Sequence, residues 1–180
     1  MKREKIPDLL AWFRLLSSPI ILFLILDDGS DSGLMLIPAV VAFIAACTDY
    51  FDGKLARKWN VSSKSGAFLD TIADKIFVSV IFIGFTVIGR VSIWITILLI
   101  SREFIVMALR GMAGNEGSMI PPSITGKLKA SFQFWSIGFV MLDFDFTLLN
   151  WNLDEIVVSI ALLLSYISGY QYFREYYKNQ

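Results

Sequence analysis

The chain has 180 residues, of which 56% are hydrophobic, and its 16 basic residues balance its 16 acidic residues. This apolar share, with a mean hydropathy of +0.63, exceeds that of a typical water-soluble domain and indicates that lipid surrounds the fold. The sequence contains no His, which excludes Ser-His nucleophile systems and most types of zinc site. Acid–base chemistry is therefore left to Asp, Glu, Lys, Tyr or Cys, and we expect any bound metal to be a hard cation with oxygen ligands.

Six apolar segments follow one another along the chain, and each is close to the roughly 20 residues that a helix needs to cross a bilayer core. They cover approximately residues 7–26, 34–53, 67–89, 91–112, 124–142 and 152–173. Arg14 interrupts the first of these apolar stretches, which argues against a cleaved signal peptide. Because the sequence shows no linker and no internal repeat, we expect one all-α membrane domain over residues 1–180, with six transmembrane helices.

The connections between these segments differ in charge. Those at 27–33, 90 and 143–155 contain seven acidic residues and only Arg90 as a cation, whereas the other 15 Lys and Arg residues lie elsewhere. Lys and Arg concentrate on the cytoplasmic side of membrane proteins, so this distribution predicts that both termini are cytoplasmic. We therefore expect a multi-pass protein of the cell (inner) membrane.

Four carboxylates lie at the ends of the second and third segments, beside the expected cytoplasmic connection at 54–66: Asp49, Asp52, Asp70 and Asp74. The members of each pair are three or four residues apart, which places both on one face of a helix. Helices joined by a short connection pack as antiparallel neighbours, so the four can converge. Divalent cations would offset their mutual repulsion. The alternative is that the four carboxylates are only interfacial or ion-paired residues. We favour a functional role, because ionisable groups inside a membrane usually serve a function.

Small residues and an arginine lie between the two carboxylate pairs. Gly53 follows the first pair directly, Ala56 precedes Arg57, and Gly66 opens the third segment. Small residues let a ligand approach the backbone, and an Arg guanidinium can bind a phosphate with two hydrogen bonds. The stretch therefore predicts a nucleotide site, although each glycine alone could simply ease helix packing.

These positions together resemble the signature of the CDP-alcohol phosphatidyltransferases. The match covers all eight fixed positions, Asp49-x2-Asp52-Gly53-x2-Ala56-Arg57-x8-Gly66-x3-Asp70-x3-Asp74. The resemblance implies a homodimeric membrane enzyme that holds two divalent cations, Mg²⁺ or Mn²⁺, among the four Asp residues. It implies nucleotide contacts from Asp52, Gly53, Ala56, Arg57 and Gly66. It also implies that Asp74 is both a ligand and the base: Asp74 takes the acceptor hydroxyl proton, the oxygen attacks the lipid-linked phosphorus, and CMP leaves.

The rest of the chain is most similar to the bacterial phosphatidylglycerophosphate synthases. The similar stretches include Ile6-Pro7-x-Leu9-Leu10, Arg102-Glu103-Phe104-Ile105 and Gly126-Lys127-Leu128-Lys129. This similarity implies CDP-diacylglycerol as the donor and sn-glycerol 3-phosphate as the acceptor. The acceptor phosphate requires cations, and the candidates are Arg102, Arg110, Lys127 and Lys129. Other roles stay open, because Arg102 could pair with Glu103 or with an Asp of the site, and the lysines could be cytoplasmic anchors.

Other functions are compatible with parts of this pattern. The same chemistry could use inositol phosphate, serine or phosphatidylglycerol as the acceptor. A divalent-cation transporter is an alternative from a different class, but the Asp cluster is expected at one interface, whereas transporter sites usually lie near the bilayer midplane. We expect a lipid bilayer and a second copy of the chain as partners, and no nucleic acid.

Overall fold

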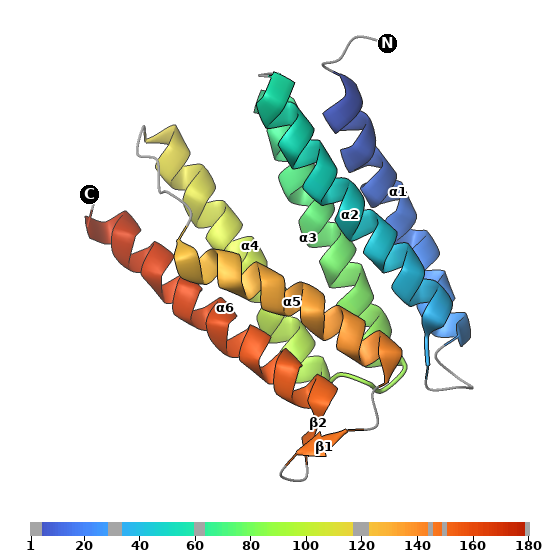
Figure 1. Ribbon diagram of the computed structural model, residues 1–180. Helices are drawn as coiled ribbons and strands as arrows, with labels where there is room; N and C mark the ends of the chain where they lie inside the picture. Colours follow the sequence, from blue (N-terminus) through green and yellow to red (C-terminus); the bar gives the residue numbers. More distant parts are fainter. Residues whose placement is uncertain are drawn as a thin grey trace. The chain divides into compact units, whose positions relative to one another are not determined.

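The computed structural model describes residues 5–28, 34–59, 64–116, 123–143, 146–148 and 151–178. For residues 5–8, 10, 48–59, 64, 65 and 67 it describes the backbone alone. The chain forms two compact units, Met1–Arg90 and Val91–Gln180, and the described part of each contains three helices (Figure 1). The all-α class expected from the sequence is thereby confirmed. The single domain over residues 1–180 stays a prediction.

The first unit consists of α1 (Lys5–Asp28), α2 (Leu36–Trp59) and α3 (Lys64–Val87), and α1 packs against both of the others. Its core is built from side chains that are almost fully buried: Ala11, Ile21, Ile25, Ala73, Phe77, Ile81 and Phe85. Gly84 allows α3 to approach α1 closely, because a Cβ at this position would lie 3.1 Å from Cγ2 of Ile25. After α3, Gly89 has a φ of 76°, which glycine adopts without the strain of a side chain.

The second unit consists of α4 (Ile93–Asn115), α5 (Ile124–Leu142) and α6 (Leu153–Lys178), and α6 packs against both α4 and α5. Ser123 caps the start of α5, since its Oγ accepts a hydrogen bond from the backbone N–H of Gly126 at 3.0 Å. Asp143 ends α5 in the left-handed conformation. A cluster of buried side chains joins α4 to α6: Val106, Leu109, Ala113, Tyr172 and Tyr176.

A two-stranded hairpin precedes α6, where the sequence suggested only a loop. Strands β1 (Thr147–Leu148) and β2 (Trp151–Asn152) are antiparallel, with Thr147 opposite Asn152 and Leu148 opposite Trp151. Strands of two residues are too short to show an alternating apolar pattern, which is why the sequence did not reveal them.

The six helices of the described residues match the six apolar segments expected from the sequence, but several helix ends lie beyond the expected bounds. We expected the second segment to end at 53 and a connection to cover 54–66, whereas α2 continues to Trp59 and α3 begins at Lys64. Residues 54–58 are Lys, Leu, Ala, Arg and Lys, all strong helix formers. The helix therefore continues after the apolar stretch has ended.

The helices carry many apolar side chains on their outer surfaces. On α1 these side chains recur at helical spacing along one face, and each is at least half exposed: Leu9, Trp12, Phe13, Leu16, Ile20 and Phe23. By length and composition, α6 is the one helix in the described part of the chain that could cross a membrane, and Leu36–Cys47 is a shorter apolar stretch. The number of spans and the side on which the termini lie stay predictions.

Candidate functional site

Asp70 and Asp74 lie one turn apart on α3 and share one partner on α1. Nη1 of Arg14 donates to Oδ1 of Asp70 at 3.1 Å and also contacts Oδ1 of Asp74. The two carboxylate side chains are 42% and 37% exposed, whereas Arg14 is 2% exposed. The four-residue spacing thus brings both carboxylates to one face of the helix, as the sequence predicted.

The other half of the predicted carboxylate group lies on α2. Asp49 and Asp52 both fall within this helix, so their backbone positions lie on one helical face. Gly53, Ala56 and Arg57 follow on the same helix rather than in a loop. The side chains of these five residues lie outside the described ones, so their convergence with Asp70 and Asp74 stays a prediction. Gly66 lies in the first turn of α3 and is half-buried.

The two described carboxylates, Asp70 and Asp74, suit a hard divalent cation. Asp70 and Asp74 offer carboxylate oxygens that remain partly open to solvent, and such oxygens are the ligands that Mg²⁺ and Mn²⁺ prefer. The side chains that the structure describes contain no group of three or more His, Cys, Asp or Glu that could hold a metal ion. The predicted four-carboxylate site would also need Asp49 and Asp52 of α2, whose side chains lie outside the described ones.

Arg14 is the residue of this site that the sequence analysis did not assign. The sequence did contain a signal for this role, since Arg14 is a charge inside an apolar segment. A buried cation requires a counter-charge nearby. The sequence alone did not identify that counter-charge, since Arg14 and Asp74 are separated by 60 residues.

In the second unit, Arg102 lies in a buried network between α4 and α6. Its Nη1 donates to Oε1 of Glu103 at 2.9 Å, its Nε donates to the backbone oxygen of Ser165 at 2.7 Å, and its Nη2 donates to Oγ of Ser168. Gly169 makes room for the guanidinium, because a Cβ there would lie 3.3 Å from Nε. The pairing of Arg102 with Glu103 is the structural role that the sequence analysis left open beside phosphate binding.

Lys129 joins the same network from α5. Its Nζ forms an ion pair with Oε1 of Glu103, and both residues are buried. One carboxylate oxygen therefore contacts two cations that come from different helices. Neither Arg102 nor Lys129 presents its charge to solvent.

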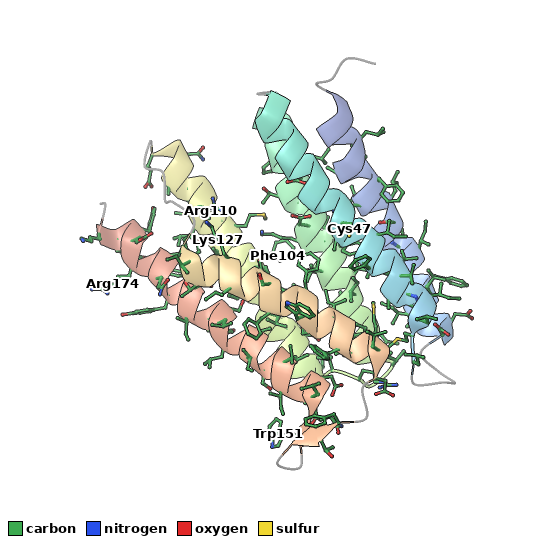
Figure 2. All side chains as sticks on the ribbon, viewed as in Figure 1. Cys47, Phe104, Arg110, Lys127, Trp151 and Arg174 are labelled. Carbon is green, nitrogen blue, oxygen red and sulfur yellow. The ribbon has the colours of Figure 1, made fainter. Side chains whose placement is uncertain are left out.

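Arg110 and Lys127 differ from that pair because both are exposed. Figure 2 labels them on α4 and near the start of α5. The guanidinium carbon of Arg110 lies 5.9 Å from the ring centre of Tyr172, which is a cation–π distance. The hydroxyl of Tyr172 accepts a hydrogen bond at 3.2 Å from the backbone N–H of Ser123, just before α5. Tyr172, which the sequence analysis did not single out, thus contacts both Arg110 and the segment that leads into Lys127.

The chain is similar to known proteins over most of its length. The model of the family described as CDP-alcohol phosphatidyltransferase matches residues 4–167. A protein of Mycobacterium tuberculosis named "Probable phosphatidylglycerophosphate synthase" is 35% identical over 167 residues, which cover 92% of this chain and 78% of that protein. Proteins named "CDP-diacylglycerol--glycerol-3-phosphate 3-phosphatidyltransferase" are 37% identical in Wigglesworthia glossinidia brevipalpis, covering 93% and 88% of the two chains, and 32% identical in Bacillus subtilis, covering 75% and 70%.

Proposed function

The chain belongs to the CDP-alcohol phosphatidyltransferase family, and on that premise we propose that it transfers the phosphatidyl group of CDP-diacylglycerol to sn-glycerol 3-phosphate. The products are phosphatidylglycerophosphate and CMP. The observation that carries the proposal is the family match over residues 4–167, together with relatives that are named for this donor and this acceptor. The paired carboxylates of α3 support the same reaction from the structure.

Two divalent cations, Mg²⁺ or Mn²⁺, are proposed to bind among the four carboxylates Asp49, Asp52, Asp70 and Asp74. Bound there, they would neutralise the diphosphate of the donor and stabilise the leaving CMP. The partial exposure of Asp70 and Asp74 supports this assignment, because a cation and a nucleotide both have to reach these oxygens from water.

Asp74 is proposed as the base. Its carboxylate accepts the proton of the acceptor hydroxyl, the hydroxyl oxygen forms a bond to the phosphorus that carries diacylglycerol, and the bond from that phosphorus to CMP breaks. The absence of His from the sequence favours a carboxylate for this step. Asp52, Gly53, Ala56, Arg57 and Gly66 are proposed to hold the nucleotide.

The acceptor phosphate is proposed to bind among Arg102, Arg110, Lys127 and Lys129. Arg110 and Lys127 are exposed, which supports a direct contact between these two cations and a dianionic phosphate. Arg102 and Lys129 are bound to Glu103 inside the unit. Their burial supports a role in holding α4, α5 and α6 at the correct spacing for the exposed pair.

We further propose six transmembrane spans, cytoplasmic termini and an active site at the cytoplasmic face of the cell (inner) membrane, in a homodimer. The exposed apolar face of α1, formed by residues such as Trp12, Leu16 and Phe23, supports burial in lipid. The nucleotide headgroup of the donor lipid and the acceptor glycerol 3-phosphate are both charged and hydrated. This agrees with a site at the membrane surface.

A panel of acceptors tests the reaction. Purified protein in detergent is supplied with CDP-diacylglycerol, Mg²⁺ and one labelled acceptor at a time: glycerol 3-phosphate, inositol phosphate, serine or phosphatidylglycerol. We expect label from glycerol 3-phosphate to enter lipid with release of CMP. Incorporation of inositol phosphate, and none of glycerol 3-phosphate, would disprove the proposed acceptor but retain the reaction class.

A further inference from the structure

Arg14 contacts the two carboxylates that are proposed to bind metal. A single nitrogen, Nη1, lies against Oδ1 of Asp70 and Oδ1 of Asp74. The arginine is 2% exposed, so water cannot solvate its charge when the neighbouring carboxylates bind another ligand. Because an Arg guanidinium stays protonated in proteins, Arg14 is a permanent positive charge next to these two side chains.

Two opposing effects follow from this position. Arg14 holds Asp70 and Asp74 on the side of α3 that faces α1, which reduces the side-chain entropy that would be lost when the carboxylates bind a ligand. It also repels any cation that shares these carboxylates. The repulsion energy is several times larger than the entropic free energy of ordering one side chain. This holds for charges a few ångströms apart at the effective dielectric constant of about 20 that applies near protein surfaces.

We propose that Arg14 is a positioning residue that competes with divalent metal for Asp70 and Asp74, and so keeps metal binding weak until the diphosphate of the donor lipid is present. This inference rests on the proposed metal site. Each carboxylate has about four lone-pair positions on its two oxygens, so contact with Arg14 through Oδ1 does not exhaust its capacity. The diphosphate adds negative charge, which offsets the charge of Arg14 and couples metal binding to donor binding.

Binding of Mn²⁺ to the purified protein in detergent, measured by electron paramagnetic resonance without nucleotide, tests the inference. We expect Arg14→Met to lower the dissociation constant for Mn²⁺ by about tenfold or more, because the repulsion is removed. Arg14→Lys keeps the charge and should stay within about threefold of the wild type. Equal or weaker binding by Arg14→Met would overturn the proposal.

A second measurement examines the coupling to the donor. Addition of CDP-diacylglycerol without acceptor should tighten Mn²⁺ binding strongly in the wild type and only slightly in Arg14→Met. An equal tightening in both proteins would count against the proposal. If Arg14→Met does not give a monodisperse, helical protein, Arg14→Gln replaces it with a neutral side chain that can still donate to a carboxylate.

Asp70→Asn separates failure of the inference from failure of the proposed function. If the wild type and Asp70→Asn bind Mn²⁺ alike, Asp70 is not a metal ligand, and the proposed four-carboxylate metal site is wrong. If Asp70→Asn loses Mn²⁺ while Arg14→Met binds as the wild type does, the metal site stands and only the role of Arg14 is wrong.

Discussion

Lys129 on α5 forms an ion pair with Glu103 on α4 inside the second unit, where the two residues are only 7% and 8% exposed. The same carboxylate oxygen accepts a hydrogen bond from Arg102, which is bonded in turn to the backbone of α6 at Ser165. One acidic side chain thus joins α4 to α5 directly, and it is connected to α6 through Arg102. A buried group of this kind is stable only while its charges stay compensated.

Replacement of Glu103 should therefore destabilise the second unit. In Glu103→Gln, Arg102 and Lys129 would remain buried without their shared negative charge. Loss of one member of a buried ion pair typically costs about 3–5 kcal/mol. We expect a clear decrease in the thermal unfolding midpoint in detergent. The exposed Glu175 on α6 provides the control, because Glu175→Gln should change the stability by no more than about 0.5 kcal/mol. Equal midpoints for the two variants would refute a stabilising role for the network.

Gly169 on α6 should be sensitive to the addition of a single methyl group. A Cβ at this position would lie 3.3 Å from Nε of Arg102, and this nitrogen is held by its hydrogen bond to Ser165. The strain of over-packing is typically about 1–3 kcal/mol, which outweighs the gain of roughly 1 kcal/mol in helix propensity from Gly to Ala. We expect Gly169→Ala to unfold at a lower temperature than the wild type.

Gly111 on α4 serves as the matched control for Gly169. A Cβ at Gly111 would meet nothing within 4 Å, so Gly111→Ala should leave the unfolding midpoint unchanged or raise it. If both alanine variants behave alike, the close approach of Gly169 to Arg102 has no energetic consequence.

Interactions within one helix could be predicted from the sequence, and those between helices could not. The pairing of Asp70 with Asp74 on one face follows from their spacing alone. Arg14 and Asp74 are 60 residues apart, and Arg102 and Ser165 are 63 apart, so these contacts depend on how the helices pack. The sequence did show that Arg14 and Arg102 are charges in apolar surroundings.

The two candidate roles for the carboxylates of α3 lead to a prediction for catalysis. Asp74→Asn removes the proposed base and a metal ligand, so we expect kcat to fall by at least about 10²–10⁴-fold. Asp70→Asn should also abolish most of the transfer through loss of metal. Release of labelled CMP from CDP-diacylglycerol measures both, and circular dichroism checks that the helices persist. Asp154→Asn, in the first turn of α6, should keep normal activity. Near-normal turnover by Asp74→Asn would exclude Asp74 as the base.

Arg110 provides the test of the acceptor site, because it is exposed and the cations of the buried network are not. A hydrogen bond to a charged group contributes about 1.5–3 kcal/mol, so Arg110→Ala should raise KM for glycerol 3-phosphate by roughly 10- to 100-fold, with a smaller effect on kcat. KM for CDP-diacylglycerol should stay nearly constant. Arg174→Ala removes another exposed cation, on α6 (Figure 2), and should leave both constants unchanged. A similar rise in KM in both variants would indicate a general effect of surface charge and would argue against a phosphate contact at Arg110.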